Sequence, residues 1–304
     1  MNSSKPTILF IPGAWHLPFV FDDTRAALAA RGFPSAAVGL PAVGAEPPTK
    51  GLIDDTVAVR DEIERLSDQG KQVVVVAHSY GGMVGAGAVK GLGYAERKKR
   101  GKSGGVTMLV YMAAFVAKAG TSMSDMFGGE FPPFMKFDGD YCRAEDAEGI
   151  FYNDLSLQDR KKWSSEAVHT SRAVYEGRAA HEPWHDLPCM YIFCENDMAV
   201  PLAVQESMAG LLGEYTQFRL PSSHSPFLSM PTKLAEASDT YQNPAKMAPP
   251  VTRSRSNDPG RMTGDAGTNT PRPPTPTPGA YPDSPEEQRE EVEQSTRRDE
   301  RVPI

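Results

Sequence analysis

The strongest constraint on the fold is a run of four valines, Val73–Val76, that ends abruptly in small residues around a single serine. A continuous run of β-branched residues predicts a buried strand, and Gly82–Lys90 predicts a helix directly after it. Between them Ser79 is flanked, two positions before and two positions after, by Ala77 and Gly81. This spacing is typical of a nucleophile elbow, a strained strand-to-helix turn that exposes a reactive serine. The alternative is a serine that only caps an ordinary helix.

Short β-rich runs alternate with helical patterns along residues 5–241. Strands that are each followed by a helix predict an α/β fold, with a mostly parallel sheet and helices on both faces. The predicted strands are Thr7–Ile11, Ser35–Val38, Gln72–Ala77, Val106–Met112, Cys189–Cys194 and Thr216–Leu220, and the predicted helices are Phe21–Arg31, Leu52–Gln69, Gly82–Lys90 and Leu202–Leu212.

The alternation is interrupted over about residues 116–187, a segment rich in aromatic side chains. Helical pieces such as Ser156–His169 predict a lid inserted before the strand Cys189–Cys194. An aromatic lid favours a largely apolar ligand cavity, although the same side chains can simply pack the lid onto the domain. We expect Trp163 of this lid to contact the substrate.

The composition changes after residue 241. Residues 242–304 contain 12 of the 27 prolines and few large apolar residues. Such a segment cannot bury enough apolar surface to offset the entropy of ordering, so we expect a disordered tail. Its proline run, Pro271–Pro278, favours polyproline II and would suit an SH3 or WW module.

Charge and cysteine content exclude several classes of protein. The net charge of −7 and the pI of about 5.5 provide no basic footprint for nucleic acid. Three cysteines cannot build a disulfide framework. The first apolar run, Ile8–Ile11, is too short for a secretory signal or a membrane span. We therefore expect a cytoplasmic protein that binds neither membranes nor nucleic acid.

A serine hydroxyl needs a general base before it becomes a good nucleophile. Of the six histidines, only His224 follows the last predicted strand, where it can reach Ser79. His78 adjoins Ser79, but side chains of adjacent residues at an extended strand end point in opposite directions. The histidines of the lid, which we expect at the surface, are His169, His181 and His185.

The base in turn needs an acid that orients it. Where the serine lies at a nucleophile elbow, the acid falls between the serine and the histidine in the sequence. The loop after the strand Met190–Cys194 contains two candidates. Asp197 is our choice, and Glu195, which is nearer the strand end, is the alternative.

Two backbone N–H groups must hold the oxyanion that forms during attack on a carbonyl. One is predicted to come from Tyr80, the residue after the nucleophile. The other is predicted to come from Ala14, in the loop after the first strand, where Gly13 permits a turn. We also expect His16 of this loop to contact the substrate.

With these residues in place, residues 5–241 resemble the α/β-hydrolase superfamily. Four segments are similar to the branch that contains plant methylesterases and hydroxynitrile lyases, and the chain also resembles small hydrolases found beside fungal polyketide pathways. The segments are P-G-A-W-H (Pro12–His16), A-H-S-Y-G-G (Ala77–Gly82), the loop of Asp197, and S-H-S-P-F-L-S (Ser223–Ser229).

Two departures refine what the resemblance implies. Hydroxynitrile lyases carry a lysine directly after the catalytic histidine and a threonine in the first oxyanion loop, where this chain has Ser225 and Gly13. This argues against cyanohydrin cleavage. Epoxide hydrolases and dehalogenases of this fold use an aspartate nucleophile, which Ser79 excludes.

The resemblance then implies a serine hydrolase that cleaves an ester or lactone bond of a small, fairly apolar molecule, with a secondary metabolite as one possible substrate. It implies no metal and no organic cofactor. The same triad can also support carbon–carbon bond hydrolysis or acyl transfer. A further alternative is a non-catalytic ligand receptor, because some proteins of this fold keep the pocket without turnover.

Overall fold

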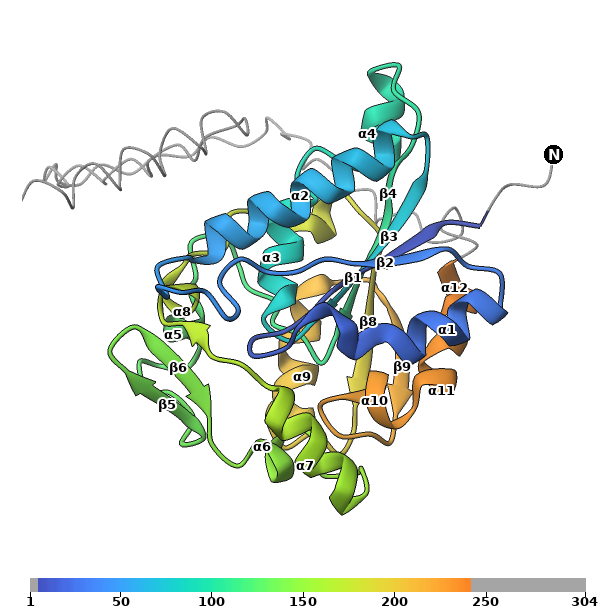
Figure 1. Cartoon of the computed structure of the whole chain (residues 1–304). Helices are drawn as coiled ribbons and strands as arrows, with labels where there is room; N and C mark the ends of the chain where they lie inside the picture. Colours follow the sequence, from blue (N-terminus) through green and yellow to red (C-terminus); the bar gives the residue numbers. More distant parts are fainter. Residues whose placement is uncertain (1–4, 242–304) are drawn as a thin grey trace, which may run out of the picture. The chain divides into compact units, whose positions relative to one another are not determined.

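Six parallel strands form the central sheet of the computed structural model, which describes residues 5–241 (Figure 1). The predicted tail, residues 242–304, lies outside the described residues. The strands lie in the order β2–β1–β3–β4–β8–β9. Their bounds agree with the sequence prediction to within one residue: β1 Thr7–Ile11, β2 Ser35–Ala37, β3 Gln72–His78, β4 Gly105–Met112, β8 Cys189–Cys194 and β9 Thr216–Leu220.

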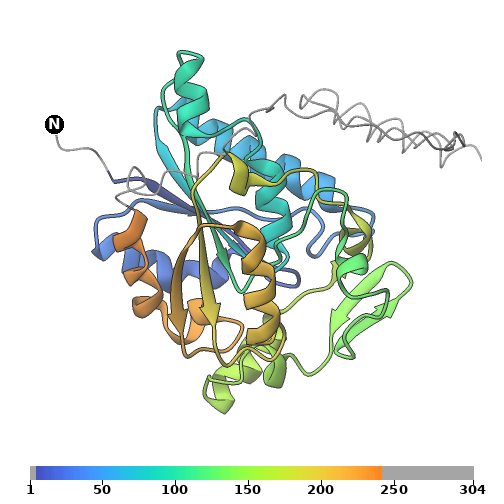
Figure 2. The ribbon, with the colours of Figure 1, turned by 180° about the vertical axis from the view of Figure 1, so that it is seen from behind.

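Helices cover both faces of this sheet, as predicted. The third of them, α3, is buried along nearly its whole length beneath the end of β3. In the view from behind, α9 lies beside β8 (Figure 2). The bounds are η1 Pro18–Phe21, α1 Asp22–Ala30, α2 Leu52–Asp68, α3 Gly81–Ala88, α4 Tyr94–Lys99, α9 Leu202–Ala209, η3 Gly210–Leu212, α10 Pro226–Ser229, α11 Pro231–Glu236 and α12 Ser238–Tyr241, with η marking 3₁₀ turns.

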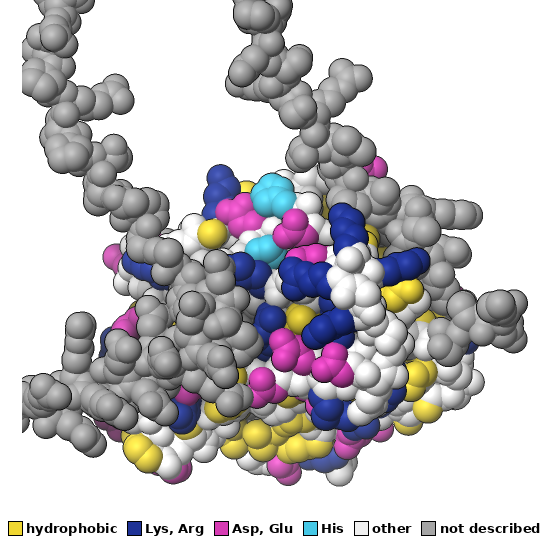
Figure 3. All heavy atoms as spheres, turned by 90° about the horizontal axis from the view of Figure 1, so that it is seen from above, with side chains coloured by type: hydrophobic (Ala, Val, Ile, Leu, Met, Phe, Trp, Pro, Cys, Tyr) yellow, Lys and Arg dark blue, Asp and Glu magenta, His cyan; other side chains and the backbone are white. Residues whose placement is uncertain are grey.

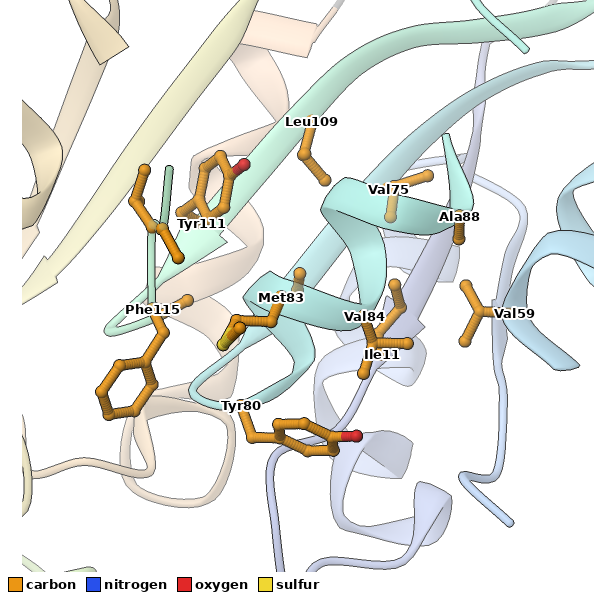
Figure 4. Packing of buried hydrophobic residues seen from close by; sticks show 14 of the residues in the cluster. Ile11, Val59, Val75, Tyr80, Met83, Val84, Ala88, Leu109, Tyr111 and Phe115 are labelled. Atoms are coloured by element: carbon orange, nitrogen blue, oxygen red, sulfur yellow. The ribbon is translucent and has the colours of Figure 1, made fainter. Parts of the chain in front are cut away.

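The valine run packs on both sides of the sheet. Val73 and Val75 join a hydrophobic cluster with residues of α2 and α3, while Val74 and Val76 join a second cluster with residues of α1 and α11. A strand buried on both faces needs apolar side chains at every position, which explains the unbroken run. Figure 4 shows the first cluster where α3 packs between Val75, Val59 and the ring of Phe115.

The lid, residues 116–187, is only partly helical. The helix predicted over Ser156–His169 exists as α7, but it ends at Glu166 because Ala167 is extended. The lid also contains an antiparallel sheet, β5–β6–β7, that the sequence analysis did not predict. The bounds are α5 Met123–Met126, β5 Met135–Asp138, β6 Tyr141–Ala144, α6 Ala147–Ile150, α7 Leu157–Glu166, β7 Thr170–Ser171, α8 Ala173–Glu176 and η2 Pro183–His185.

The hairpin β5–β6 has a local signal in the sequence. Asp138-Gly139 lies between two short runs that alternate in polarity, and Asp-Gly in that setting favours a hairpin turn. Gly139 adopts a positive φ of 56°, which glycine accepts without steric cost.

Positive and negative side chains alternate on the surface near α4. Figure 3, which views the molecule from that side, shows Lys and Arg interspersed with Asp and Glu. Among the ion pairs of the described residues, the buried Arg97 pairs with Asp68, and Arg60 pairs with Glu64. Within residues 5–241, no helix combines the length and the apolar character needed to cross a bilayer.

Candidate active site

Ser79 lies at the turn between β3 and α3, in a strained backbone conformation. Its φ is 53°, a left-handed value that a residue with a side chain rarely adopts. The turn is fixed on both sides. The Ser79 amide donates to the carbonyl of Met112 (3.2 Å), and the Ser79 carbonyl accepts from the amides of Gly82 (3.0 Å) and Phe115 (3.1 Å). This is the geometry expected of a nucleophile elbow.

The small residues around Ser79 are required by close backbone contacts. A Cβ at Gly81 would lie 2.6 Å from the carbonyl oxygen of Pro12, and a Cβ at Gly82 would lie 2.4 Å from the carbonyl oxygen of Phe115. A Cβ at Gly13 would lie 2.8 Å from the Cβ of Ser79. The loop after β1, which contains the predicted oxyanion donor Ala14, therefore lies directly against the serine.

His224 and Asp197 form a buried hydrogen-bonded pair. The Nδ1 of His224 is 2.7 Å from Oδ2 of Asp197. The other carboxylate oxygen of Asp197 accepts from the amides of Ala199 and Val200, each at 2.8 Å. Glu195, the alternative acid, is exposed and lies 3.7 Å from the guanidinium of Arg219. His224 thus contacts Asp197, whereas Glu195 lies at the surface beside Arg219.

Gln205 of α9 completes the surroundings of the carboxylate, and the sequence analysis missed it. Its fully buried amide donates to the carbonyl of Cys194 (2.9 Å) and accepts from the amide of the same residue (3.0 Å). The same Nε2 lies 3.4 Å from Oδ2 of Asp197. One glutamine on a helix has no sequence signal for this role, because the contact depends on how α9 packs beside β8.

His78 supports the backbone of His224. Its Nε2 donates to the carbonyl of His224 (2.9 Å), and the two ring centroids are 4.5 Å apart. Burial, followed by the proximity of His224, holds the pKa of His78 well below its usual range. His78 is therefore a neutral donor. The sequence analysis had set it aside because its ring points away from Ser79.

His16 is buried in the loop after β1. Its Nδ1 is 2.9 Å from the carbonyl of Ala14, so Nδ1 carries the proton. Its Nε2 must then accept from the hydroxyl of Tyr152, also at 2.9 Å. Burial, with a smaller effect of His224, lowers the pKa of His16 to about 4. Both ring nitrogens are thus used within the protein, and substrate contact by His16 stays a prediction.

The remaining predicted residues lie as follows. Tyr80 directly precedes α3, so its backbone amide has no acceptor within the helix. Its ring belongs to the hydrophobic cluster shown in Figure 4. Trp163 is partly buried in the lid, with its ring stacked on Phe19 at 6.1 Å between centroids. Substrate contact by Trp163 stays a prediction.

The lid histidines are not all at the surface. His169 is buried, and its Nε2 lies 2.8 Å from the carbonyl of Ala45, so the surface prediction is wrong for this residue. A carbonyl partner from the loop before α2 explains the burial, since a buried ring nitrogen needs a hydrogen bond. His181 is half-buried beside Asp186, and His185 is exposed beside Glu182.

Thiol chemistry has little support in the structure. The three cysteines are free and buried. Burial raises the pKa of Cys142 to about 11 and that of Cys189 to about 12, so both thiols stay protonated at neutral pH. In the part of the chain that the structure describes, no group of three or more His, Cys, Asp or Glu side chains could hold a metal ion.

A cavity of about 570 Å³ lies between the lid and the loop that follows Asp197. Phe134 lines this cavity and also contacts the loop after β1, since its ring centroid is 6.1 Å from that of Trp15. The lining is mostly apolar with charged groups among it: Pro132, Pro133, Phe134, Lys136, Glu145, Asp146, Ile150, Met198, Ala199 and Pro201.

Three known proteins illustrate what the chain is similar to. A probable hydrolase, R7, from the fungus Phoma sp. is 31% identical over 243 residues, which cover 77% of this chain and 96% of that protein. The crystal structure of a pyrethroid hydrolase from Sphingobium faniae JZ-2 aligns with a TM-score of 0.64 at 23% identity, over 79% of this chain and 99% of that one. The methylesterase MES16 from Arabidopsis aligns with a TM-score of 0.60 at 18% identity, over 78% of this chain and 99% of that one.

A family model makes the assignment directly. Residues 8–237 match the model described as the alpha/beta hydrolase family. This range includes every strand of the central sheet from Ile8 onward and all three residues of the predicted triad. The chain therefore belongs to the α/β hydrolase family.

Proposed function

We propose that the protein is a serine hydrolase that cleaves an ester or lactone bond of a small, fairly apolar molecule. One observation carries the proposal: the buried hydrogen bond of 2.7 Å between His224 and Asp197, in loops that follow the same sheet end as the strained turn at Ser79. A histidine that donates Nδ1–H to a buried carboxylate presents Nε2 as a proton acceptor. That is the protonation state that a general base needs.

In the proposed reaction, His224 accepts the proton of Ser79 while the serine oxygen attacks the carbonyl carbon. The amides of Tyr80 and Ala14 hold the oxyanion of the tetrahedral intermediate. Collapse expels the alcohol, which takes the proton from His224, and leaves an acyl-enzyme. Water activated by His224 then hydrolyses the acyl-enzyme, with Asp197 orienting the imidazole throughout.

Two observations support an apolar substrate of modest size. The cavity beside the loop of Asp197 is lined mostly by proline, aromatic and aliphatic residues, and its volume falls within the usual range for small-molecule sites, although Ser79 and His224 are not among its lining residues. The solved structures that resemble the chain include a protein named as a pyrethroid hydrolase and one named as a methylesterase.

The proposal can be tested with a fluorophosphonate probe and intact-mass spectrometry of the full-length protein, with Ser79→Ala as the matched control. We expect one covalent adduct on the wild type and none on the variant. A panel of esters and lactones should then be hydrolysed with multiple turnover, and Ser79→Ala should keep the fold but lose the rate. An unlabelled, folded wild type that binds ligands without turnover would instead favour a receptor.

A further inference from the structure

Four consecutive residues between α6 and α7 contact all three loops of the proposed site. We call residues 151–154, Phe-Tyr-Asn-Asp, the lid clamp. Each of its side chains reaches a catalytic loop: the oxyanion loop after β1, the loop of Asp197 after β8, and the loop of His224 after β9. Nothing in the sequence pattern marked this segment, apart from its aromatic residues.

The first two residues of the lid clamp hold the oxyanion loop. The ring of Phe151 stacks on Trp15 with 5.4 Å between centroids and an interplanar angle of 25°. The hydroxyl of Tyr152 donates to Nε2 of His16, whose Nδ1 donates to the carbonyl of Ala14. A continuous hydrogen-bonded path therefore runs from the lid to the peptide group next to a proposed oxyanion donor.

The last two residues hold the loops of the acid and the base. The side-chain amide of Asn153 donates through Nδ2 to the carbonyl of Asn196 (3.1 Å), the neighbour of Asp197. One carboxylate oxygen of Asp154 accepts from the amide of Ser223 (2.9 Å), the neighbour of His224. Both contacts are to main-chain atoms, so they fix the course of the loops rather than one side-chain rotamer.

The lid clamp is itself held rigidly. The guanidinium of Arg160 in α7 donates to the carbonyl of Leu155 (2.9 Å) and to that of Asn153. The hydroxyl of Ser156 caps α7 by accepting from the amide of Asp159 (3.1 Å). The carbonyls of Asn153 and Leu155 are thus both held by one side chain of the first turns of α7.

We propose that Asp154 is a positioning residue, which holds the loop of His224 in register with Ser79 through the amide of Ser223. The inference rests on the serine-hydrolase function proposed above. The physical reason is that reacting groups must lie within a few tenths of an ångström of the attack geometry, and a shift of about 1 Å costs about 10²-fold in rate. Asp154 touches no reacting atom, so its effect falls on kcat rather than on substrate affinity.

The chain offers a conservative variant that separates the hydrogen bond from the charge. The other oxygen of Asp154, Oδ1, has no hydrogen-bond partner among the described residues. In Asp154→Asn the amide oxygen can still accept from Ser223, and the amide nitrogen replaces the atom that has no partner. Asp154→Ala removes the acceptor. Glu166→Ala removes a charge from the exposed end of α7, the helix that follows the lid clamp, and serves as the control.

The experiment compares the rate of fluorophosphonate labelling, kcat and KM for these three variants and the wild type. It adds hydrogen–deuterium exchange of the loop 222–225, which reports the contact without requiring activity. We expect Asp154→Ala to lower the labelling rate and kcat at least tenfold, to change KM less than threefold, and to speed exchange of the loop. Asp154→Asn should recover at least a third of the wild-type rate, and Glu166→Ala should match the wild type.

The outcomes distinguish failure of the serine-hydrolase function from failure of the positioning role of Asp154. A wild type that resists labelling overturns the serine-hydrolase function, whatever the exchange data show. A labelled wild type with equal rates in Asp154→Ala, or with Asp154→Asn as impaired as Asp154→Ala, overturns the positioning role. If Asp154→Ala fails to fold, Asp154→Asn carries the test alone, and a folded Asp154→Asn with less than a third of the wild-type rate counts against the inference.

Discussion

The phenol of Tyr80 donates a hydrogen bond of 2.8 Å to Asp55, which joins the residue after the proposed nucleophile to helix α2. The second oxygen of this fully buried carboxyl accepts from the amide of Ala42, also at 2.8 Å. Burial raises the pKa of Asp55 to about 7, although both hydrogen bonds act in the opposite direction. The position of the elbow is thus connected to a carboxyl that titrates near neutral pH.

The pKa of Asp55 predicts a pH-dependent contribution to stability. Between its ordinary value of 3.8 and about 7, the folded protein keeps a proton that the unfolded chain has released. Stability from this group is therefore complete below pH 3.8 and is lost as the pH rises through 7, by up to about 4 kcal/mol. Asp55→Asn cannot ionise, so it should gain stability relative to the wild type between pH 5 and pH 8.

Urea unfolding of wild type and Asp55→Asn at pH 5, 6, 7 and 8 measures this difference. Asp23→Asn, at an exposed position of α1, is the control and should follow the wild type at every pH. Parallel pH profiles for wild type and Asp55→Asn would show that the carboxyl is ionised throughout this range.

The low pKa of His16 predicts that the folded protein loses stability in acid. Its pKa of about 4 lies below the ordinary value of 6.5, so the unfolded chain binds a proton that the folded protein does not. Stability from this group is present above pH 6.5 and is lost as the pH falls toward 4, by up to about 3 kcal/mol. His16→Gln should flatten the decline between pH 6.5 and pH 4, whereas His185→Gln, at an exposed position, should leave it unchanged.

Asp197→Asn tests the assignment of the acid. An asparagine cannot fix the imidazole of His224 in the tautomer that a general base needs, so we expect kcat to fall by about 10⁴ with little loss of fold. Glu195→Gln should stay within about twofold of the wild type, because Glu195 lies beside Arg219. A large effect in Glu195→Gln together with a small one in Asp197→Asn would reverse the assignment.

Gly13→Ala should damage the oxyanion loop selectively. The new Cβ would lie 2.8 Å from that of Ser79 and 3.0 Å from Nδ1 of His78, so the loop must shift away from the serine. Displacement of the Ala14 amide should lower kcat by about 10²–10³. Gly39→Ala, whose Cβ would meet only Pro18 at 3.6 Å, is the matched control and should keep full activity.

Ser79→Gly should stabilise the protein while abolishing its activity. The φ of 53° costs a residue with a Cβ about 1–2 kcal/mol, and glycine avoids that cost. Part of the gain is lost because glycine makes the unfolded chain more flexible, so we expect a net increase in unfolding free energy of up to about 1 kcal/mol. Ser79→Ala keeps the strain and should be less stable than Ser79→Gly in the same urea titration.

Local patterns in the sequence were sufficient to predict the six strands of the central sheet and four of its helices, α1, α2, α3 and α9, but not α4, α10, α11 or α12. The strands could be predicted because burial on both faces requires continuous apolar runs such as Val73–Val76, and that requirement acts within a few residues. The turn at Ser79 could be predicted because its steric limits fall on its immediate neighbours, such as Gly81. The hairpin β5–β6 was missed, although Asp138-Gly139 marks it.

Contacts between distant segments could not be predicted in this way. Asp154 meets Ser223 across 69 residues, and Tyr152 meets His16 across 136. A single aspartate or tyrosine carries no pattern that identifies such a partner. Local sequence was enough to locate the strands of the central sheet and the candidates for chemistry, because both depend on neighbours along the chain. The contact of His224 with Asp197 and the contacts of the lid clamp with the loops after β1, β8 and β9 arise only in the folded chain, because they depend on how separate elements pack.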